Sequence, residues 1–336
     1  MLNTSIKYIA PHWYLGCDQN CKECYFSVRD KKITTPMDER IRAIDAIMPY
    51  NPVEFFIVGG NPTLDPHLEE TVNVLKQRGV MVEVLSNSWS MPFVKNKSAL
   101  LEKIDHRAAT FFGADAAMHD GLNGCRGSFE RLRANLRGDY SFIPVINIMP
   151  ANKDSVYEII KGLRNFIKFD TVWTQRIMPY GAAIGHKGMY LGAEDLNPIF
   201  KQLSRARDDF KLKEVQWNMT APTCLVNFEY HGMNDPVCYG VSMWGLDPKG
   251  RLFVNSFELS KPELALFNGR PVWEIKGNLL DAINDNSRVR SLYGKNYMPA
   301  SCKRCECYKN CFGGYPIWNS AGGWNIDPMM SSRRQR

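Results

Sequence analysis

The hydrophobic pattern divides the chain into two parts. From Lys7 to about Ala221, apolar runs of strand length alternate with segments in which apolar residues recur at helical spacing. Strands are predicted at residues 7–10, 54–58, 81–85, 108–112, 142–148 and 171–177. Helical stretches follow the strands, among them residues 66–78, 154–166 and 194–207. This alternation predicts an α/β fold of parallel strands and crossover helices, and six such units favour a partial (β/α)6 TIM-like barrel over a full one.

After residue 221 the pattern changes to turns and short strands. Asp247-Pro248-Lys249-Gly250 predicts a turn between strands at 241–246 and 251–254, and a helical stretch follows at 279–290. The sequence therefore predicts a barrel domain at residues 1–221 and a smaller C-terminal α+β domain at residues 222–336. We expect a bound metal, rather than a large core, to hold the second domain together.

Composition narrows the class of protein. With 336 residues, 44% of them hydrophobic, the chain is long and apolar enough to bury a sizeable core, which excludes disordered and fibrous proteins. No apolar run approaches the roughly 18 residues of a membrane span, and the first residues do not resemble a signal peptide, so we expect a cytoplasmic protein without membrane contact. The formal charge of +7 is mild and favours an acidic peptide over a nucleic acid as partner.

The cysteines form two groups. Ten are present, with three in residues 17–24 and four in residues 302–311, and such grouping in a cytosolic chain predicts metal binding rather than disulfides. Cys17, Cys21 and Cys24 follow the first predicted strand with the spacing C-x3-C-x2-C. Three thiolates can hold a [4Fe-4S] cubane with one iron open to another ligand. The alternatives are three core cysteines on one helix face, or a zinc site completed by His12.

At this spacing the first group resembles the signature of the radical S-adenosylmethionine (SAM) superfamily. Gly59-Gly60-Asn61-Pro62-Thr63, at the end of the second predicted strand, resembles the GGEPT segment of that family, whose backbone receives the amino group of SAM. Asn61 stands where the family usually has Glu, and Glu23 stands where an aromatic residue often precedes the third cysteine. The resemblance implies a radical SAM barrel with a [4Fe-4S] cluster and SAM as cofactors.

Later segments extend the resemblance. Residues 85–88 resemble the third-strand "TNG" segment, residues 114–129 resemble the fourth-strand "SLDG…HD…RG-x-F" pattern with Gly113 in place of Ser, and residues 175–181 resemble the segment that closes the cofactor site. The resemblance implies ten cofactor-binding residues: Gly59, Gly60, Asn61, Pro62, Ser86, Asn87, Asp115, Arg126, Gln175 and Arg176.

The second cysteine group resembles the C-terminal array of SPASM and twitch domains, which hold auxiliary clusters. Its residues are Cys302-x2-Cys305-x5-Cys311 followed by Gly313-Gly314, and Cys238 lies twelve positions before Gly250 as in that family. The resemblance implies one auxiliary [4Fe-4S] cluster, with Cys302, Cys305, Cys311 and Cys238 as ligands.

The family pattern is incomplete in this second part. Asn255 and Tyr315 stand at expected cysteine positions, so two complete auxiliary clusters are not expected. Cys307 or Cys224 are alternatives to Cys238, and a structural zinc site with the same cysteines is the alternative to iron and sulfide. Cys125 is interpreted as a small buried apolar residue.

The reaction implied by the resemblance is hydrogen abstraction by a 5′-deoxyadenosyl radical. The truncated SPASM-like end and the 12% aromatic content favour a ribosomally made precursor peptide as substrate, modified by splicease-type backbone excision, epimerisation or crosslinking. Cys224 is a candidate hydrogen donor, with a structural role as the alternative. The rival functions are a radical SAM dehydrogenase or mutase acting on a small molecule, and a non-catalytic iron-sulfur or zinc protein.

Two partners are also expected. The chain begins a few residues before the first predicted strand, which predicts that a separate small protein recognises the leader of the precursor peptide. The resemblance further implies a flavodoxin or ferredoxin that supplies electrons.

Overall fold

The computed structural model describes most of the chain. The described residues are 4–26, 32–218, 221–233, 243–295, 298, 300–306 and 311. Among the residues named above, Cys238, Cys307, Gly313, Gly314 and Tyr315 lie outside them.

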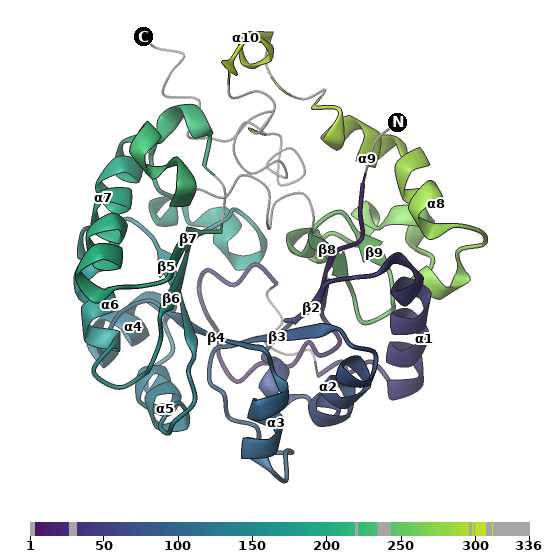
Figure 1. Cartoon of the computed structure of the whole chain (residues 1–336), viewed down its shortest axis with the longest axis horizontal. Coiled ribbons are helices and arrows are strands. Elements are labelled where there is room, and N and C mark those ends of the chain that lie inside the picture. Colours follow the sequence, from purple (N-terminus) through teal and green to yellow (C-terminus); the bar gives the residue numbers. More distant parts are fainter. Residues whose placement is uncertain are drawn as a thin grey trace.

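A single curved sheet forms the centre of the molecule (Figure 1). Within the described part, it has nine strands in the order β7-β6-β5-β4-β3-β2-β1-β8-β9. All neighbouring pairs from β7 to β8 are parallel, and only β8 and β9 are antiparallel. The strands are β1 (Tyr8–Pro11), β2 (Glu54–Ile57), β3 (Met81–Ser86), β4 (His106–Phe111), β5 (Ile143–Ile148), β6 (Thr171–Arg176), β7 (Glu214–Trp217), β8 (Met243–Leu246) and β9 (Leu252–Phe253).

The six strands expected from the sequence are all present, and the structure adds to them. The predicted series missed β7, which pairs with β6 at the sheet edge. The predicted hairpin around Asp247–Gly250 is confirmed as β8 and β9, but β8 also pairs with β1 and so extends the main sheet. The division of the chain after residue 221 stays a prediction.

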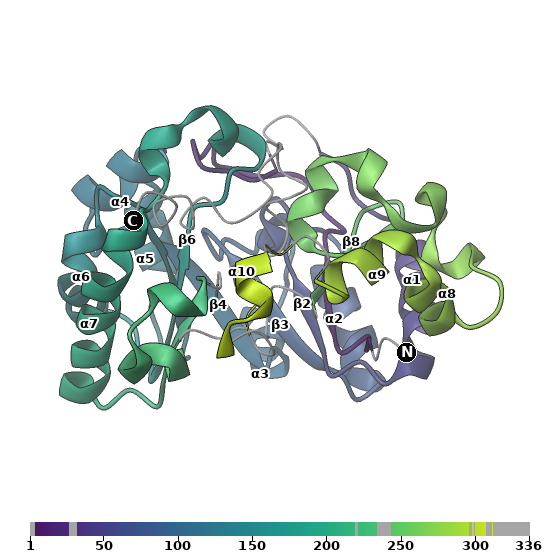
Figure 2. The ribbon, with the colours of Figure 1, turned by 90° about the horizontal axis from the view of Figure 1, so that it is seen from above.

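Helices cover the convex face of the sheet, and the strands line its interior (Figures 1 and 2). The expected helix at 279–290 is two helices, because Asn286 caps the second one by accepting hydrogen bonds from the backbone of Arg288 and Val289. The helices are α1 (Met37–Ile47), α2 (Leu68–Gln77), α3 (Lys97–Lys103), α4 (Ala116–Asn123), α5 (Ser128–Asn135), α6 (Val156–Leu163), α7 (Ala193–Phe210), α8 (Leu279–Asp285), α9 (Ser287–Tyr293) and α10 (Ala300–Lys303).

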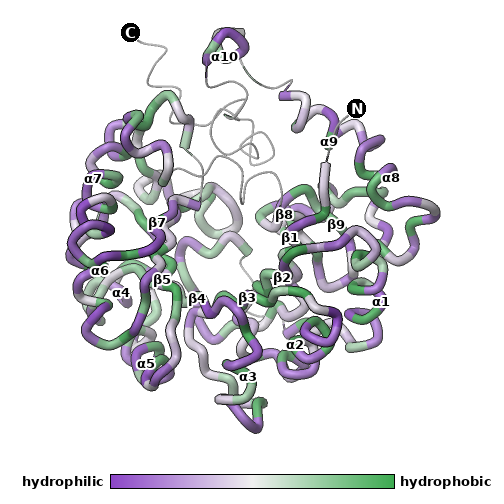
Figure 3. The backbone as a smooth tube through the Cα atoms, in the orientation of Figure 1, coloured by the Kyte–Doolittle hydropathy of each residue, from purple (hydrophilic) through white to green (hydrophobic). Residues whose placement is uncertain are grey.

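Strand alternation builds two separate apolar layers. In β2, Phe55 and Ile57 belong to the large core between the sheet and the helices, whereas Phe56 packs inside the barrel. The inner layer also contains Leu85, Ala108 and Val145 from the next three strands. Figure 3 shows hydrophobic and hydrophilic residues interleaved along the helices that surround the sheet. The inner layer therefore separates the two ends of the barrel interior.

A buried ion pair fixes α1 to the segment that follows β2. Arg40 and Asp65 are 1% and 2% exposed, and the Arg40 Nη1 atom lies 2.6 Å from Asp65 Oδ2. The second contact, Nη2 to Oδ1, is 3.0 Å, so the pair is bidentate. Arg40 also donates to the Thr35 carbonyl oxygen and to the Thr71 hydroxyl. Because these donors are satisfied, the pair is held rigidly.

We expect Asp65→Ala to lower the free energy of unfolding by about 3–5 kcal/mol, because it leaves the Arg40 guanidinium buried without its carboxylate. Chemical denaturation of the full chain measures this loss. Asp38→Ala is the matched control, since Asp38 pairs with Arg42 on the surface, and it should cost less than about 1 kcal/mol. Equal losses in the two variants would contradict the assignment.

Candidate active site

A cavity of about 230 Å³ opens at the carboxyl ends of the parallel strands. This is the end at which barrel enzymes place their chemistry. The cavity brings together all three N-terminal cysteines with five of the ten predicted cofactor-binding residues. These eight residues are Cys17, Cys21, Cys24, Gly59, Gly60, Asn87, Gln175 and Arg176.

The loop before the cysteines and the glycine segment are joined through their backbones. The Gly60 N–H donates to the Tyr14 carbonyl oxygen at 2.9 Å, and the Asn61 N–H donates to the Gly16 carbonyl oxygen at 2.7 Å. A Cβ atom at Gly59 would lie 2.3 Å from the Tyr14 oxygen, and one at Gly60 would lie 2.1 Å from the Gly16 oxygen. Gly59 also has a φ of +142°, which favours glycine. Only glycine permits this approach.

Cys17 is held by donors from two loops. Its Sγ atom accepts hydrogen bonds from the Gln19 backbone N–H at 3.5 Å and from Asn87 Nδ2 at 3.3 Å. Burial raises the pKa of Cys17 to about 11. A metal or cluster at this position would stabilise the thiolate and offset that effect.

Cys125 corrects one interpretation from the sequence. It is only partly buried, and its Sγ atom accepts a hydrogen bond from the Asn20 backbone N–H at 3.1 Å. A hydrogen bond between Cys21 and Cys125 raises the pKa of Cys21 and lowers that of Cys125. A fourth thiol therefore adjoins the cysteine motif, and the description of Cys125 as a buried apolar residue is wrong.

Asn61 is fully buried and links three loops. Its Oδ1 atom accepts from the hydroxyls of Thr63 and Ser86, at 2.9 and 2.8 Å. Its Nδ2 atom donates to Ser88 Oγ at 2.6 Å and to Asp18 Oδ1 at 3.0 Å. An ionised glutamate at this position would have no hydrogen to donate. The two hydrogen bonds donated by the amide therefore explain why asparagine occupies position 61 instead of glutamate.

The other half of the predicted cofactor-binding set does not line the cavity. Asp115 caps α4 by accepting from the Met118 backbone N–H at 2.8 Å. Asp120, in the "HD" of the fourth-strand pattern, accepts from the backbone N–H groups of Gly127 and Phe129 and so positions the start of α5. The predicted residues outside the cavity wall are Asn61, Pro62, Ser86, Asp115 and Arg126.

Several wall residues were not predicted as site residues. Glu23 is 8% exposed, and burial raises its pKa to about 7. His119 is 1% exposed, and burial lowers its pKa to about 4, which favours the neutral ring. Thr110 and Asn147 lie on β4 and β5 and face the cavity. In the sequence, each is a polar residue within an apolar strand, at one of the alternate positions whose side chains point into the barrel.

The residues present fit a [4Fe-4S] cluster with SAM. Three free thiols face one cavity, and the adjoining glycine segment presents backbone without side chains. In the wall, Glu23 Oε2 and Asn87 Oδ1 are buried without a hydrogen-bond partner among the described residues. Such atoms are costly to bury unless a polar ligand meets them.

The second cysteine group is described in part. Cys302 lies in α10, the Cys305 N–H donates to the Cys302 carbonyl oxygen at 3.0 Å, and Cys311 is 6% exposed. Cys224 lies in a 3-10 turn, Thr223–Leu225, and is not among the residues that line the cavity. Figures 1 and 2 place α10 over the open side of the sheet, between its two ends.

Several solved structures are similar in fold to this chain, and two of these proteins, SuiB and anSMEcpe, have been solved with bound SAM, also written AdoMet. Streptococcus suis SuiB bound to precursor peptide SuiA aligns with a TM-score of 0.73 and 14% identity, over 98% of this chain and 76% of SuiB. Hexahistidine-tagged anSMEcpe with bound AdoMet aligns with a TM-score of 0.72 and 13% identity, over 98% and 92% of the two chains. Native anSMEcpe with bound AdoMet and Cp18Cys peptide aligns with a TM-score of 0.69 and 12% identity, over 98% of this chain and 95% of anSMEcpe.

The chain shares the fold of these structures, a partial TIM-like barrel around a largely parallel sheet. The predicted class, a partial TIM-like barrel of this type, is confirmed by the parallel sheet and by these alignments. No family model and no curated protein matches the sequence. In the described part of the chain, no helix has the length and apolar character needed to cross a membrane.

We expect Gly60→Ala to lower the free energy of unfolding by about 1–3 kcal/mol, because its Cβ would press the Gly16 backbone away. Gly121→Ala is the matched control. Gly121 lies in α4, and among the described residues no atom outside its own stretch of helix lies within 4 Å of the position that its Cβ would take. Alanine there should therefore be neutral or stabilise by up to about 1 kcal/mol. Denaturant midpoints measure both changes, and an unaltered midpoint in Gly60→Ala would refute the close approach.

Proposed function

We propose that this chain is a radical SAM enzyme that modifies a ribosomally made precursor peptide. The observation that supports this most strongly is the convergence of Cys17, Cys21 and Cys24 on one cavity beside the glycine segment. In the proposal, the three thiolates bind a [4Fe-4S] cluster and leave one iron for SAM. When bound, this pair supplies reductive cleavage of the sulfonium and a 5′-deoxyadenosyl radical.

The remaining wall residues bind and orient. The backbone at Gly59 and Gly60 receives the ammonium group of SAM, since no side chain blocks its approach. Arg176, 3% exposed at the end of β6, binds a carboxylate. Gln175 donates to Asn147 Oδ1 at 2.6 Å, which fixes both amides for contact with the ligand. Five other predicted residues do not line this cavity: Asn61, Pro62, Ser86, Asp115 and Arg126. Their proposed contacts with SAM would have to involve surfaces outside the cavity wall.

The other side of the cavity excludes water. Tyr25, Phe112, Met178 and Phe257 contribute aromatic and apolar surface to it. Tyr25 and Phe257 pack together, with ring centroids 4.7 Å apart. A dry wall protects a reactive radical from competing hydrogen donors.

A peptide substrate is supported by the chemistry of the structural neighbours. SuiB has been solved with precursor peptide SuiA, and anSMEcpe with AdoMet and either the Cp18Cys or the Kp18Cys peptide. Backbone excision of the splicease type, epimerisation and crosslinking are the candidate outcomes, with Cys224 as a candidate hydrogen donor. We also propose a separate leader-binding protein, a flavodoxin or ferredoxin reductant, and a cytoplasmic location, as the sequence predicts.

We propose in addition one auxiliary [4Fe-4S] cluster bound by Cys302, Cys305, Cys311 and Cys238. Two observations support an ordered site at this end of the chain. Cys311 is buried, and its carbonyl oxygen accepts a hydrogen bond from Lys295 Nζ at 3.2 Å. Four thiolates satisfy a cubane completely, which suits a cluster that binds no substrate.

Anaerobically reconstituted protein should contain about eight irons per chain, for one catalytic and one auxiliary cluster. We expect the triple variant Cys17→Ala/Cys21→Ala/Cys24→Ala to retain about four irons per chain and to lose the EPR signal that SAM perturbs. Cys125→Ala, which removes the adjoining thiol but no proposed ligand, is the control and should retain both. Zinc in place of iron, or a reduced signal insensitive to SAM, would overturn the enzyme assignment.

With precursor peptide, dithionite and SAM, the purified enzyme should modify the peptide only when a leader-binding partner is added. Mass spectrometry distinguishes the outcomes, because excision removes a fragment, crosslinking removes a pair of hydrogen atoms and epimerisation leaves the mass unchanged. Full modification by the enzyme alone would refute the separate partner. Rapid turnover of a small molecule without any peptide would favour a dehydrogenase or mutase instead.

A further inference from the structure

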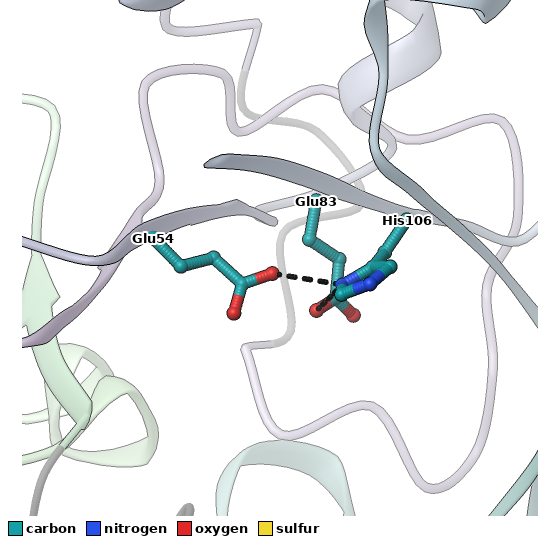
Figure 4. Close-up of side chains that lie close together, drawn as sticks. All are labelled: Glu54, Glu83 and His106. Atoms are coloured by element: carbon teal, nitrogen blue, oxygen red, sulfur yellow. Dashed lines mark hydrogen bonds and ion pairs between the residues drawn. The ribbon is translucent and has the colours of Figure 1, made fainter. Parts of the chain in front are cut away.

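A second polar cluster lies inside the sheet, at the opposite end of the strands from the cysteines. Its members are Glu54, the first residue of β2, Glu83 in β3, and His106, the first residue of β4. Glu83 and His106 are direct partners in the parallel register of their strands. The three side chains extend from these neighbouring strands toward one another (Figure 4).

The spacing of the donor atoms suits a small cation. His106 Nδ1 lies 3.2 Å from Glu54 Oε1 and 3.9 Å from Glu83 Oε2. One ligand atom from each of the three residues lies within 4.8 Å of the other two. Two donors bound to one zinc ion at about 2.1 Å, with a tetrahedral angle between them, are about 3.4 Å apart. Small side-chain rotations would therefore bring all three atoms to one ion.

Glu83 lacks a hydrogen-bond partner in this cluster. It is fully buried, and neither carboxylate oxygen has a hydrogen-bond partner among the described residues. Burial and the nearby charge of Glu54 raise the pKa of Glu83 well above its ordinary value. The hydrogen bond to Glu54 raises the pKa of His106, and the carboxylate of Glu214 acts in the same direction. Two carboxyl groups and one imidazole thus meet in a buried place, where ionised carboxylates would need a compensating cation.

Nearby basic side chains are engaged elsewhere. Arg107 donates to three backbone carbonyl oxygens, at 2.6–3.0 Å. Lys76 pairs with Asp105 at 2.6 Å, and Lys213 pairs with Asp170 at 2.5 Å. In the described part of the chain, Glu54, Glu83 and Glu214 therefore have no lysine or arginine as an ion-pair partner.

A cavity adjoins the cluster and is separate from the cysteine cavity. It has a volume of about 540 Å³, and Glu54, His106 and Glu214 are among its lining residues. The inner apolar layer, with Phe56 and Leu85, lies between the two ends of the barrel. Water can therefore reach the cluster without passing the cysteines.

We propose that Glu54, Glu83 and His106 bind one divalent first-row transition-metal ion, of the Zn²⁺ or Mn²⁺ type. One imidazole and two carboxylates suit these ions, whereas Ca²⁺ prefers six to eight oxygen ligands and an iron-sulfur cluster requires thiolates. Water from the cavity completes the coordination. The ion ties β2, β3 and β4 together at their amino-terminal ends and compensates the buried carboxylates.

This site is independent of the proposed enzymatic function, since none of its ligands lines the cysteine cavity. The face of a barrel at the amino ends of its strands commonly serves stability rather than catalysis. The ion is accordingly structural, and its removal should affect the stability of the chain before it affects SAM cleavage.

The test uses the full chain, treated with chelator, dialysed and then titrated with Mn²⁺ while EPR measures the free ion. Mn²⁺ is the probe because it binds oxygen and nitrogen donors and competes poorly for the thiolates of the cysteine groups. We expect one Mn²⁺ per chain in the wild type and at least about tenfold weaker binding in Glu83→Gln and in Glu54→Gln. Saturating Mn²⁺ should raise the Tm of the wild type by about 3–5 °C and leave that of the variants unchanged.

Glu158→Gln is the matched control. Glu158 lies exposed on α6, so this variant should bind Mn²⁺ and gain Tm as the wild type does. In chelator, Glu83→Gln should unfold at the same temperature as the wild type or above it, because the neutral amide removes an uncompensated carboxyl. Failure of the wild type to bind Mn²⁺, or an equal Tm shift in both glutamine variants, would overturn the proposal.

Discussion

Two backbone hydrogen bonds join the loop after β1 to the loop after β2, and the end of the barrel that carries Cys17, Cys21 and Cys24 depends on them. They bring Gly60 to Tyr14 and Asn61 to Gly16 at a separation that leaves no room for a Cβ atom. Because the loops meet by backbone alone, the cysteines that follow Gly16 are placed beside a wall without side chains. A ligand can then approach main-chain donors and acceptors directly.

Asn61 extends this contact to a third strand. Its backbone joins the first two loops, and its buried amide reaches Ser86 and Ser88 at the end of β3. One residue thus couples three neighbouring loops, while the Arg40–Asp65 pair fixes the segment that follows. A charged side chain in place of the amide would have to be compensated within this network.

The sequence predicted the six central strands and the cysteine site because both depend on local patterns. Alternation within a strand and the fixed spacing of Cys17, Cys21 and Cys24 are visible in short windows. Strand β7 was missed, because it has four residues and two of them, Glu214 and Gln216, are polar. The cluster of Glu54, Glu83 and His106 was also missed, since only the parallel register brings these distant residues together.

The same electrostatic rule operates at both ends of the barrel. Burial raises the pKa of Cys17 at one end and of Glu83 at the other, so each group prefers its proton until a cation replaces it. Binding of a cation at either proposed site would therefore release protons and offset the cost of burying these groups. The donors differ, with thiols at the carboxyl ends of the strands and carboxylates with an imidazole at the amino ends. Because soft and hard ligands select different metals, one sheet can keep two such sites distinct without any barrier beyond its inner apolar layer.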